Sequence, residues 1–373
     1  MSKRVLLVGG GTGGHIYPLI AVARALLSLE KEVSVRLMGD GPLLERAARE
    51  AGIGYIQIIA PKLRRYSSIG NLLDIFKAPI ALVQSLVRMW LYMPDVVFAK
   101  GGYTCVFPVL AARLYRIPVY LHESDAVPGL ANRMLAKRSQ LVFTSFPSSD
   151  GYFKKLGRST LLVGNPFRTE LCCVDRGLAQ SALKLDPTKK TIFVTGSSSG
   201  AQQLNDLILE VLVSLLQKNY QIIHQTGDRN FESVHQAVET LMKEGGSAFA
   251  PLIAAHYRVY PFLDQGQLAT AYGACDIAIT RGSAGMLTEL SYLSKPMIII
   301  PLAGSASDHQ ARNAQELSGF GAVVMDGANL SGQVLISQVQ RLLDPSVYPG
   351  VALRIKEFAH VDAAQRIAQT LLG

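Results

Sequence analysis

Short apolar runs alternate with longer amphipathic stretches along the first half of the chain. Residues 5–8 are four consecutive apolar residues, and apolar residues with helical spacing follow at 17–27. The first pattern is typical of a buried strand and the second of a helix. Further strands are predicted at residues 33–38, 55–59, 95–99, 119–123, 141–144 and 161–163, with helices at 43–51 and 109–115. Strands that alternate with helices predict a parallel sheet covered on both faces.

The same pattern begins again in the second half. Gly164-Asn165-Pro166 is a strong turn signal, and we place the domain boundary there. Strands are then predicted at residues 191–195, 221–224, 278–280 and 297–301. The repeat predicts two similar α/β domains, residues 1–163 and 164–345. The last segment, 346–373, is expected to rejoin the first domain through a helix at 363–372.

A glycine-rich turn follows the first strand of each half. Gly9, Gly11 and Gly14 have the G-x-G-x-x-G spacing, and residues 196–201 form a second turn of small residues. Glycine accepts positive φ and lets a ligand approach the backbone, and a helix N-terminus offers N–H groups to a phosphate. Alone, this spacing fits a nicotinamide enzyme, a nucleotide-sugar enzyme or a turn without a ligand.

The amino-acid composition further limits the classes of protein to which the chain can belong. The 373 residues are 49% hydrophobic and 17% charged, with a formal net charge of +9, which favours an anionic partner. No signature of nucleic-acid binding accompanies that charge. The four cysteines form no C-x-x-C pair, which predicts a reduced, cytosolic chain without a disulfide framework. We expect neither a signal peptide nor a spanning helix, because the apolar runs are too short, and no metal site.

Polar residues stand where several predicted strands end. In parallel sheets these ends meet at one edge, and two facing sheets would gather them in a cleft. The residues expected there are His15, Glu123, Asp125, Ser198, Arg281, Glu289, Asp308, His309 and Gln310.

Several motifs, in this order, resemble those of the MurG family of bacterial glycosyltransferases. They are Gly10-Gly-Thr-Gly-Gly-His15-Ile-Tyr-Pro, His122-Glu123, Gly164-Asn-Pro-x-Arg168, the turn at 196–201, the segment from Arg281 to Glu289, and Asp308-His309-Gln310-x-x-Asn313. The resemblance implies a GT-B fold of two Rossmann-like doubly wound domains. It implies inverting transfer of N-acetylglucosamine from UDP-N-acetylglucosamine to the 4-hydroxyl of the muramoyl sugar of lipid I, which forms lipid II. The expected location is the cytoplasmic face of the bacterial inner membrane, with no cofactor and with proteins of cell-wall synthesis and cell division as partners.

The resemblance also assigns roles to individual residues. His15 would be the general base or, alternatively, a ligand of a phosphate of the lipid acceptor, and Glu123 would be a rival base or a residue that orients one. The donor UDP-N-acetylglucosamine would contact Thr12, Gly13, Gly14, Asp125, Arg168, Ser198, Arg281, Ala284, Gly285, Met286, Glu289 and Gln310, with Glu289 on the ribose and Arg168 and Ser198 near the diphosphate. The acceptor diphosphate would lie against Gly13, Gly14, Gly102 and Tyr103.

This sequence departs from the family pattern at three places. It has Ser197 where the family usually has a second glycine, and His309 where glutamine is frequent. It also has Ser124-Asp125 in place of Gln-Asn. An ionised Asp125 accepts a hydrogen bond from a sugar hydroxyl but donates none.

Residues 61–93 combine basic residues with an apolar stripe. Lys62, Arg64, Arg65, Lys77 and Arg88 accompany apolar residues at helical spacing, among them Phe76, Ile80, Val83, Val87 and Trp90. One interpretation is a patch that docks on an anionic membrane. The other is a helix whose stripe faces the core, which the periodicity alone favours. Pro79 is expected to divide the stretch.

Three alternatives to the transferase stay open from the sequence. Another GT-B enzyme, such as a glycolipid transferase or a UDP-N-acetylglucosamine 2-epimerase, would share the site at Arg281 and Glu289. A nicotinamide-dependent oxidoreductase would use the first glycine turn, with Asp40 as its ribose ligand, and would leave the second turn unexplained. A non-catalytic scaffold would bind a nucleotide sugar or a membrane without transfer.

Overall fold

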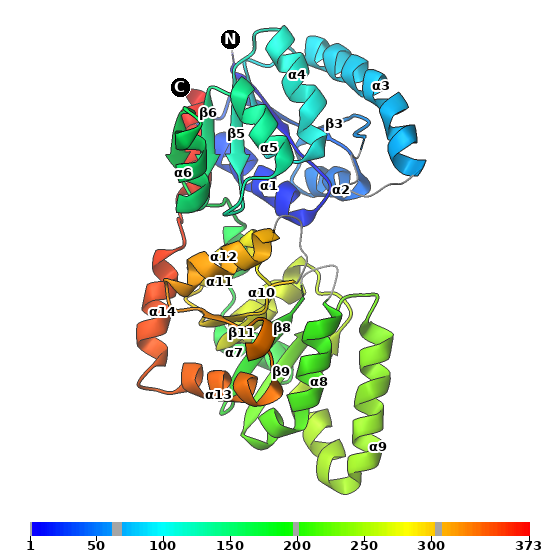
Figure 1. Ribbon diagram of the computed structural model, residues 1–373, viewed down its shortest axis with the longest axis vertical. Helices are drawn as coiled ribbons and strands as arrows, with labels where there is room; N and C mark the ends of the chain where they lie inside the picture. Colours follow the sequence, from blue (N-terminus) through cyan, green and yellow to red (C-terminus); the bar gives the residue numbers. More distant parts are fainter. Residues whose placement is uncertain (1, 62–68, 197–200, 303–307) are drawn as a thin grey trace. The chain divides into compact units, whose positions relative to one another are not determined.

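The computed structural model describes residues 2–61, 69–196, 201–302 and 308–373. They form two compact α/β units (Figure 1). One unit consists of Met1–Phe167 and His360–Gly373, and the other of Arg168–Ala359. Each unit is described by itself.

The first unit contains a parallel sheet of seven strands in the order β3-β2-β1-β4-β5-β6-β7. The strands are β1 (Arg4–Val8), β2 (Ser34–Gly39), β3 (Gly54–Gln57), β4 (Val96–Ala99), β5 (Val119–Glu123), β6 (Leu141–Thr144) and β7 (Thr160–Leu162). The helices are α1 (Gly13–Leu29), α2 (Pro42–Glu50), α3 (Ile69–Tyr92), α4 (Val106–Leu114), α5 (Leu130–Leu135), α6 (Pro147–Lys155) and α15 (Ala363–Leu372), with 3₁₀ turns at Tyr103–Cys105 and Ala136–Arg138. The order reverses between β1 and β4, where ligands bind in doubly wound sheets.

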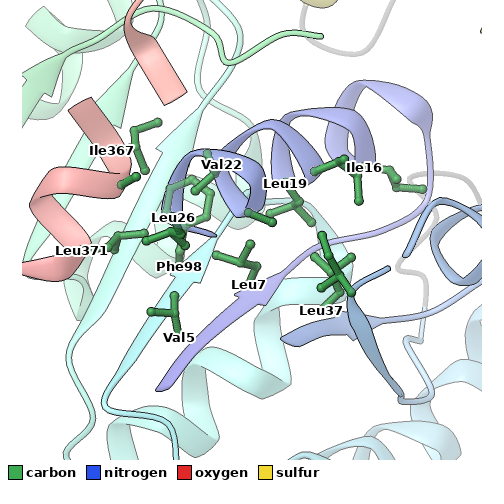
Figure 2. Close-up of a cluster of buried hydrophobic side chains, with 14 of the residues drawn as sticks. Val5, Leu7, Ile16, Leu19, Val22, Leu26, Leu37, Phe98, Ile367 and Leu371 are labelled. Carbon is green, nitrogen blue, oxygen red and sulfur yellow. The ribbon is translucent and has the colours of Figure 1, made fainter. Parts of the chain in front are cut away.

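Both faces of this sheet are buried, which explains why β1 is apolar at successive positions. Val5 and Leu7 pack under Leu26 of α1 and Leu371 of α15 (Figure 2). Leu6 and Val8 belong to the core of the opposite face, which α3 and α4 help to cover. The core therefore fixes the carboxyl ends of β1 and β4 side by side, and the glycine turns follow those ends.

The second unit repeats the arrangement with six parallel strands in the order β10-β9-β8-β11-β12-β13. The strands are β8 (Lys190–Thr195), β9 (Tyr220–Gln225), β10 (Tyr257–Tyr260), β11 (Ile277–Thr280), β12 (Met297–Ile299) and β13 (Val323–Val324). The helices are α7 (Arg176–Ala182), α8 (Gln202–Gln217), α9 (Phe231–His256), α10 (Gln265–Ala274), α11 (Ala284–Tyr292), α12 (His309–Ser318), α13 (Gly332–Leu343) and α14 (Tyr348–Glu357), with 3₁₀ turns at Thr169–Cys172 and Gly327–Asn329. Here the order reverses between β8 and β11.

The unit boundaries fall later than the positions expected from the sequence. Residues 164–167 stay with the first unit, where Gly164 N donates to Thr144 O at 3.1 Å. Helix α14 stays with the second unit, because it packs on α11 and α13. Only His360–Gly373 rejoins the first unit, and α15 packs on α1.

Four elements differ from the sequence-based prediction. Helix α1 begins at Gly13, four residues earlier than expected, so Gly13, Gly14 and His15 are helical residues and not part of the turn. Helix α3 continues through Pro79, which does not divide it. Strands β10 and β13 were not predicted, since β10 contains Arg258 among half-buried residues and β13 has two residues.

Candidate functional site

The two glycine turns of the first unit bring His15 and Tyr103 together. A Cβ atom on Gly102 would lie 3.7 Å from His15 Cε1, and one on Gly11 would lie 3.4 Å from the Tyr103 hydroxyl. Gly11, Gly101 and Gly102 all have positive φ, between 81° and 96°, which glycine adopts without strain. The turn after β1 and the turn after β4 therefore share one half-exposed surface that carries an imidazole and a phenol.

The N-terminus of α1 lies on the same surface. Thr12 is the N-cap residue, and its carbonyl accepts from His15 N at 3.0 Å and from Ile16 N at 3.2 Å. Gly13 and Gly14 open the helix, so their N–H groups have no carbonyl one turn earlier to bond. No acidic side chain stands in this first turn. Two N–H groups and the positive end of the helix dipole thus suit an anionic ligand.

Glu123 lies at the end of β5, and its carboxylate organises the loop that follows. Oε1 accepts from Asp125 N at 3.0 Å, and Oε2 accepts from Gly129 N at 3.0 Å and from Asn132 Nδ2 at 2.8 Å. Burial and the nearby Asp125 carboxylate raise the pKa of Glu123 to about 7. Both oxygens serve the chain's own loop, and this geometry suits a residue that orients the loop better than one that takes a proton from substrate.

The ammonium group of Lys100 is buried next to this loop, and the sequence-based prediction did not include it. Lys100 follows β4, and its Nζ donates to Ser124 Oγ at 2.5 Å, to Asn165 Oδ1 at 2.9 Å and to His122 Nδ1 at 2.7 Å. The position of Lys100 in the sequence, between a buried strand and the glycines of the second turn, could have indicated that it lies near the site.

In the second unit, Glu289 is held by two side chains. Arg168 contributes Nε at 3.3 Å and Nη2 at 3.2 Å to Oε1, and the Tyr272 hydroxyl donates to Oε2 at 2.7 Å. Burial and Glu289 hold the pKa of Tyr272 well above its usual range, so the hydroxyl keeps its proton. A carboxylate has about four acceptor positions, so one stays open for a ligand hydroxyl. Tyr272 lies within a helix, and nothing in the sequence pattern indicated its role.

Arg281 and Gln310 form the second pair of predicted residues that the fold brings together. Arg281 follows β11, and its Nε donates to Gln310 Oε1 at 3.2 Å. Gln310 Oε1 also accepts from Leu302 N at 3.0 Å. The close approach is possible because residue 282 is glycine: a Cβ there would lie 2.2 Å from Gln310 O.

The other residues predicted in this unit lie around these two pairs. Ala284, Gly285 and Met286 form the first turn of α11, and Met286 Sδ lies 2.8 Å from the Tyr272 hydroxyl. Asp308 is the N-cap residue of α12 and His309 its first residue. The family resemblance assigned Arg168 to the diphosphate, but in the structure its guanidinium donates to Glu289. Ser198 lies outside the described residues.

The face of α3 is the remaining predicted feature. Phe76, Ile80, Val83, Val87 and Trp90 are all exposed, with 69% of Phe76 and 62% of Trp90 accessible. Within residues 76–92 of the helix the buried side chains are Ala81, Ser85, Met89 and Tyr92, and they lie on the opposite face. The stripe therefore faces away from the core, contrary to the interpretation that periodicity alone favoured. Lys62, Arg64 and Arg65 lie outside the described residues.

The described residues contain neither a helix that could span a membrane nor a cluster of metal ligands. None of the helices there has the length and apolar character needed to cross a bilayer. The same part of the chain contains no group of three His, Cys, Asp or Glu side chains arranged to hold a metal ion.

Comparison with known proteins relates both units to sugar transferases. Residues 5–144 match the glycosyltransferase family 28 N-terminal domain, and residues 191–367 match the family 28 C-terminal domain. A Treponema pallidum protein named UDP-N-acetylglucosamine–N-acetylmuramyl-(pentapeptide) pyrophosphoryl-undecaprenol N-acetylglucosamine transferase is 34% identical over 99% of this chain and 95% of its own length. A Geobacter sulfurreducens protein of the same name is 34% identical over 99% and 98%.

Solved structures agree on the fold. The Acinetobacter baumannii MurG crystal structure has a TM-score of 0.73 at 25% identity and covers 99% of both chains. A UDP-GlcNAc 2-epimerase from Neisseria meningitidis, bound to UDP-GlcNAc, has a TM-score of 0.72 at 15% identity, over 99% of this chain and 100% of that one. The second likeness shows the fold alone. The GT-B architecture of two Rossmann-like domains, expected from the sequence, is confirmed.

Proposed function

Because the chain belongs to glycosyltransferase family 28, we propose that it transfers N-acetylglucosamine from UDP-N-acetylglucosamine to lipid I and so forms lipid II. The observation that carries the proposal is full-length similarity to transferases named for this reaction, at 34% identity over 99% of the chain. Two features of the structure suit sugar transfer. The second unit has hydrogen-bonding side chains at Glu289 and Arg281, and the glycine turns of the first unit present backbone N–H groups, an imidazole and a phenol. Nothing in the part of the chain that the structure describes specifically favours the epimerase, oxidoreductase or scaffold alternatives.

The second unit binds the donor in this proposal. The Glu289 carboxylate accepts from a ribose hydroxyl at its open acceptor position, and Tyr272 and Arg168 hold it in place. Arg281, Gln310 and the first turn of α11, Ala284 to Met286, contact the rest of UDP-N-acetylglucosamine. The hydrogen bond between Arg281 and Gln310 supports this assignment. Gln310 Oε1 accepts from Arg281, so the amide NH₂ of Gln310 is available to donate to a sugar oxygen. Ser198 is assigned to the diphosphate from the family resemblance.

The first unit binds the acceptor. The diphosphate of lipid I lies against the N–H groups of Gly13 and Gly14 and beside Gly102 and Tyr103. Thr12 and Asp125 contact the donor sugar, with Asp125 as an acceptor of a hydroxyl hydrogen. Glu123 keeps the loop of Asp125 in shape through its three hydrogen bonds.

His15 is the general base of the reaction. Its place in the first turn of α1 puts the imidazole on the surface that the two glycine turns share, and imidazole is a suitable proton acceptor near neutral pH. The 4-hydroxyl oxygen attacks the anomeric carbon on the face opposite to UDP. His15 takes the hydroxyl proton, a C–O bond forms to the acceptor, and the bond to the diphosphate breaks with its electron pair leaving on UDP. Attack from the opposite face inverts the anomeric configuration.

We propose that the enzyme works at the cytoplasmic membrane surface, and the exposed apolar face of α3 supports this location. Leu114 and Tyr115 extend the apolar surface, since Tyr115 Oη donates to the carbonyl of Leu86 in α3 at 3.3 Å. Lys77 and Arg88 are exposed on the same helix and would meet anionic headgroups. Proteins of cell-wall synthesis and division are further partners that the family resemblance suggests.

The test is transfer of labelled N-acetylglucosamine to a short-chain lipid I analogue. Expected is a product that requires the acceptor, forms from UDP-N-acetylglucosamine and forms poorly from UDP-glucose. Glu289→Ala serves as the matched variant and should abolish most transfer. Conversion of the donor to its 2-epimer without acceptor, or transfer that ignores the acceptor, would contradict the proposal.

A further inference from the structure

Lys100 carries a buried charge for which the proposed transfer gives no role. The side chain is fully buried, and its ammonium donates one hydrogen bond each to Ser124, Asn165 and His122. An ammonium has three donors and no acceptor, so these three bonds use its whole capacity. A buried lysine without such partners would be strongly destabilising.

The three contacts come from separate segments of the first unit. His122 belongs to β5, Ser124 begins the loop after that strand, and Asn165 stands just before the chain leaves the unit. His122 Nε2 lies 3.0 Å from Gly164 O, and a carbonyl only accepts, so Nε2 carries the hydrogen. Nδ1 is then an acceptor for the ammonium. Lys100 thus connects the loop of Asp125 to the chain segment 164–165.

The carboxylates on both sides of Ser124 supply the opposite charge. Burial lowers the pKa of Lys100 to about 7, and Glu123 and Asp125 act in the opposite direction. The other titratable groups near the ammonium and its partner are Cys105, whose thiol is buried, and His15, which acts on His122. Lys100 is therefore a buried cation that faces both the Glu123 and the Asp125 carboxylates.

We propose that Lys100 is a positioning residue for sugar transfer: its ammonium holds Ser124 in place and, as a positive charge that faces the neighbouring Asp125 carboxylate, fixes that carboxylate at the acceptor end of the first unit. The proposal rests on the function proposed above, in which Asp125 contacts the donor sugar. Lys100 touches no substrate, because its side chain is buried and its donors are all used within the chain.

The test compares Lys100→Met with a double variant in the full-length enzyme. Methionine keeps an unbranched side chain of similar length and removes the charge. We expect Lys100→Met to lower kcat about tenfold or more, with the Kd for UDP unchanged within about twofold, since UDP binds the second unit. Adding Asp125→Asn removes a negative charge that the Lys100 ammonium faces in the wild type, so Lys100→Met/Asp125→Asn should recover at least about threefold of the loss. Asp125→Asn alone should not raise kcat.

A purely structural lysine would give a different result. Loss of packing would lower the fraction of folded enzyme, and Asp125→Asn would not relieve it. Lys295→Met is the matched control, because Lys295 is half-buried and donates to Cys275 O at 2.6 Å away from the site, and its kcat should equal that of the wild type. If Lys100→Met does not fold, Ser124→Ala removes one partner and should lower kcat about threefold with unchanged UDP binding.

The outcomes separate this inference from the proposed function. Suppose that the wild type transfers sugar. If Lys100→Met is then equally active, or if Asp125→Asn does not rescue it, the inference about Lys100 is overturned and the proposed function stands. Where Lys100→Met is unfolded, a fully active Ser124→Ala does the same. A wild type without transfer overturns the proposed function and the inference with it.

Discussion

The hydroxyl of Tyr272 donates a 2.7 Å hydrogen bond to the carboxylate of Glu289, and both side chains are buried in the second unit. Arg168 holds the other oxygen of that carboxylate at 3.2 Å. The carboxylate therefore has a fixed orientation before any nucleotide arrives. Fixed acceptors reduce the entropy lost when a ligand binds.

Replacing Tyr272 with phenylalanine tests this preorganisation. Tyr272→Phe removes one hydrogen bond to a buried carboxylate and leaves the ring in place. We expect the Kd for UDP to rise about three- to tenfold, because hydrogen bonds to charged groups contribute roughly 1.5–3 kcal/mol and part of this is regained by water. Isothermal titration with UDP measures the change. Tyr220→Phe, at the beginning of β9, is the control and should bind as the wild type does; equal affinities for all three proteins would contradict the role of Tyr272.

The proposed base predicts a loss of turnover without a loss of donor binding. His15→Ala should lower kcat by about 10²–10⁴, the usual contribution of a general base. UDP affinity should stay unchanged, since the proposed donor site is in the second unit. The labelled transfer assay and a UDP titration give both quantities. His235→Ala removes an exposed histidine of α9 and should leave kcat unaltered. Near-normal turnover of His15→Ala would instead leave His15 as a ligand of the acceptor diphosphate.

The exposed face of α3 predicts membrane binding that depends on its aromatic residues. Phe76→Ser/Trp90→Ser removes two side chains that are 69% and 62% exposed, so the cost to folding should be small. Binding to vesicles that contain anionic lipid should weaken at least about tenfold, because each buried aromatic side chain contributes up to about 1.5–3 kcal/mol. Vesicle co-sedimentation at low and high salt is the measurement. Leu178→Ser, on α7, removes a side chain that is 71% exposed and should bind like the wild type.

Acid should destabilise the second unit through His224. Its ring is buried between Tyr257, 2.8 Å from Nδ1, and Asn205, 3.0 Å from Nε2, and burial lowers its pKa from 6.5 to about 3. Between these values the unfolded chain binds a proton that the folded unit does not. The free energy of unfolding should therefore fall as the pH drops below 6.5, by up to about 1.4 kcal/mol per pH unit from this group.

Urea unfolding between pH 7 and pH 5 measures this slope. A bound ligand stabilises the unit to which it binds. The unfolding transition that moves to higher urea concentration when UDP is added is therefore assigned to the second unit, which holds the proposed donor site. His224→Gln, which has no titrating ring, should show a shallower slope than the wild type. His235→Gln changes an exposed histidine and should keep the wild-type slope. Identical slopes in all three proteins would show that His224 is not the source.

The sequence pattern predicted the architecture well because both sheets are buried on their two faces. Continuous apolar runs such as Val5 to Val8 are strong strand signals, and the glycine turns mark the strand ends next to the sites. Edge strands carry weaker signals. β10 reads Tyr-Arg-Val-Tyr, because a half-buried edge accommodates Arg258, which donates instead to carbonyl groups such as Leu183 O.

Helix ends and site partners were harder to predict. Glycine has low helix propensity, so Gly13 and Gly14 were read as turn residues although they open α1. The partners of Glu289 and Ser124 could not be found from spacing. Tyr272 and Lys100 lie 17 and 24 residues away in the chain, and only the fold brings them into contact.

The return of His360–Gly373 to the first unit has a consequence for the growing chain on the ribosome. Ile367 and Leu371 fill the same apolar cluster as Leu26 and Val5, yet they are made only after the whole second unit. Until then the nascent first unit exposes the groove that α15 will occupy, while the second unit has all its residues and can fold. The half that is synthesised first is thus the last to complete its core, and in that interval it is the half in need of a chaperone.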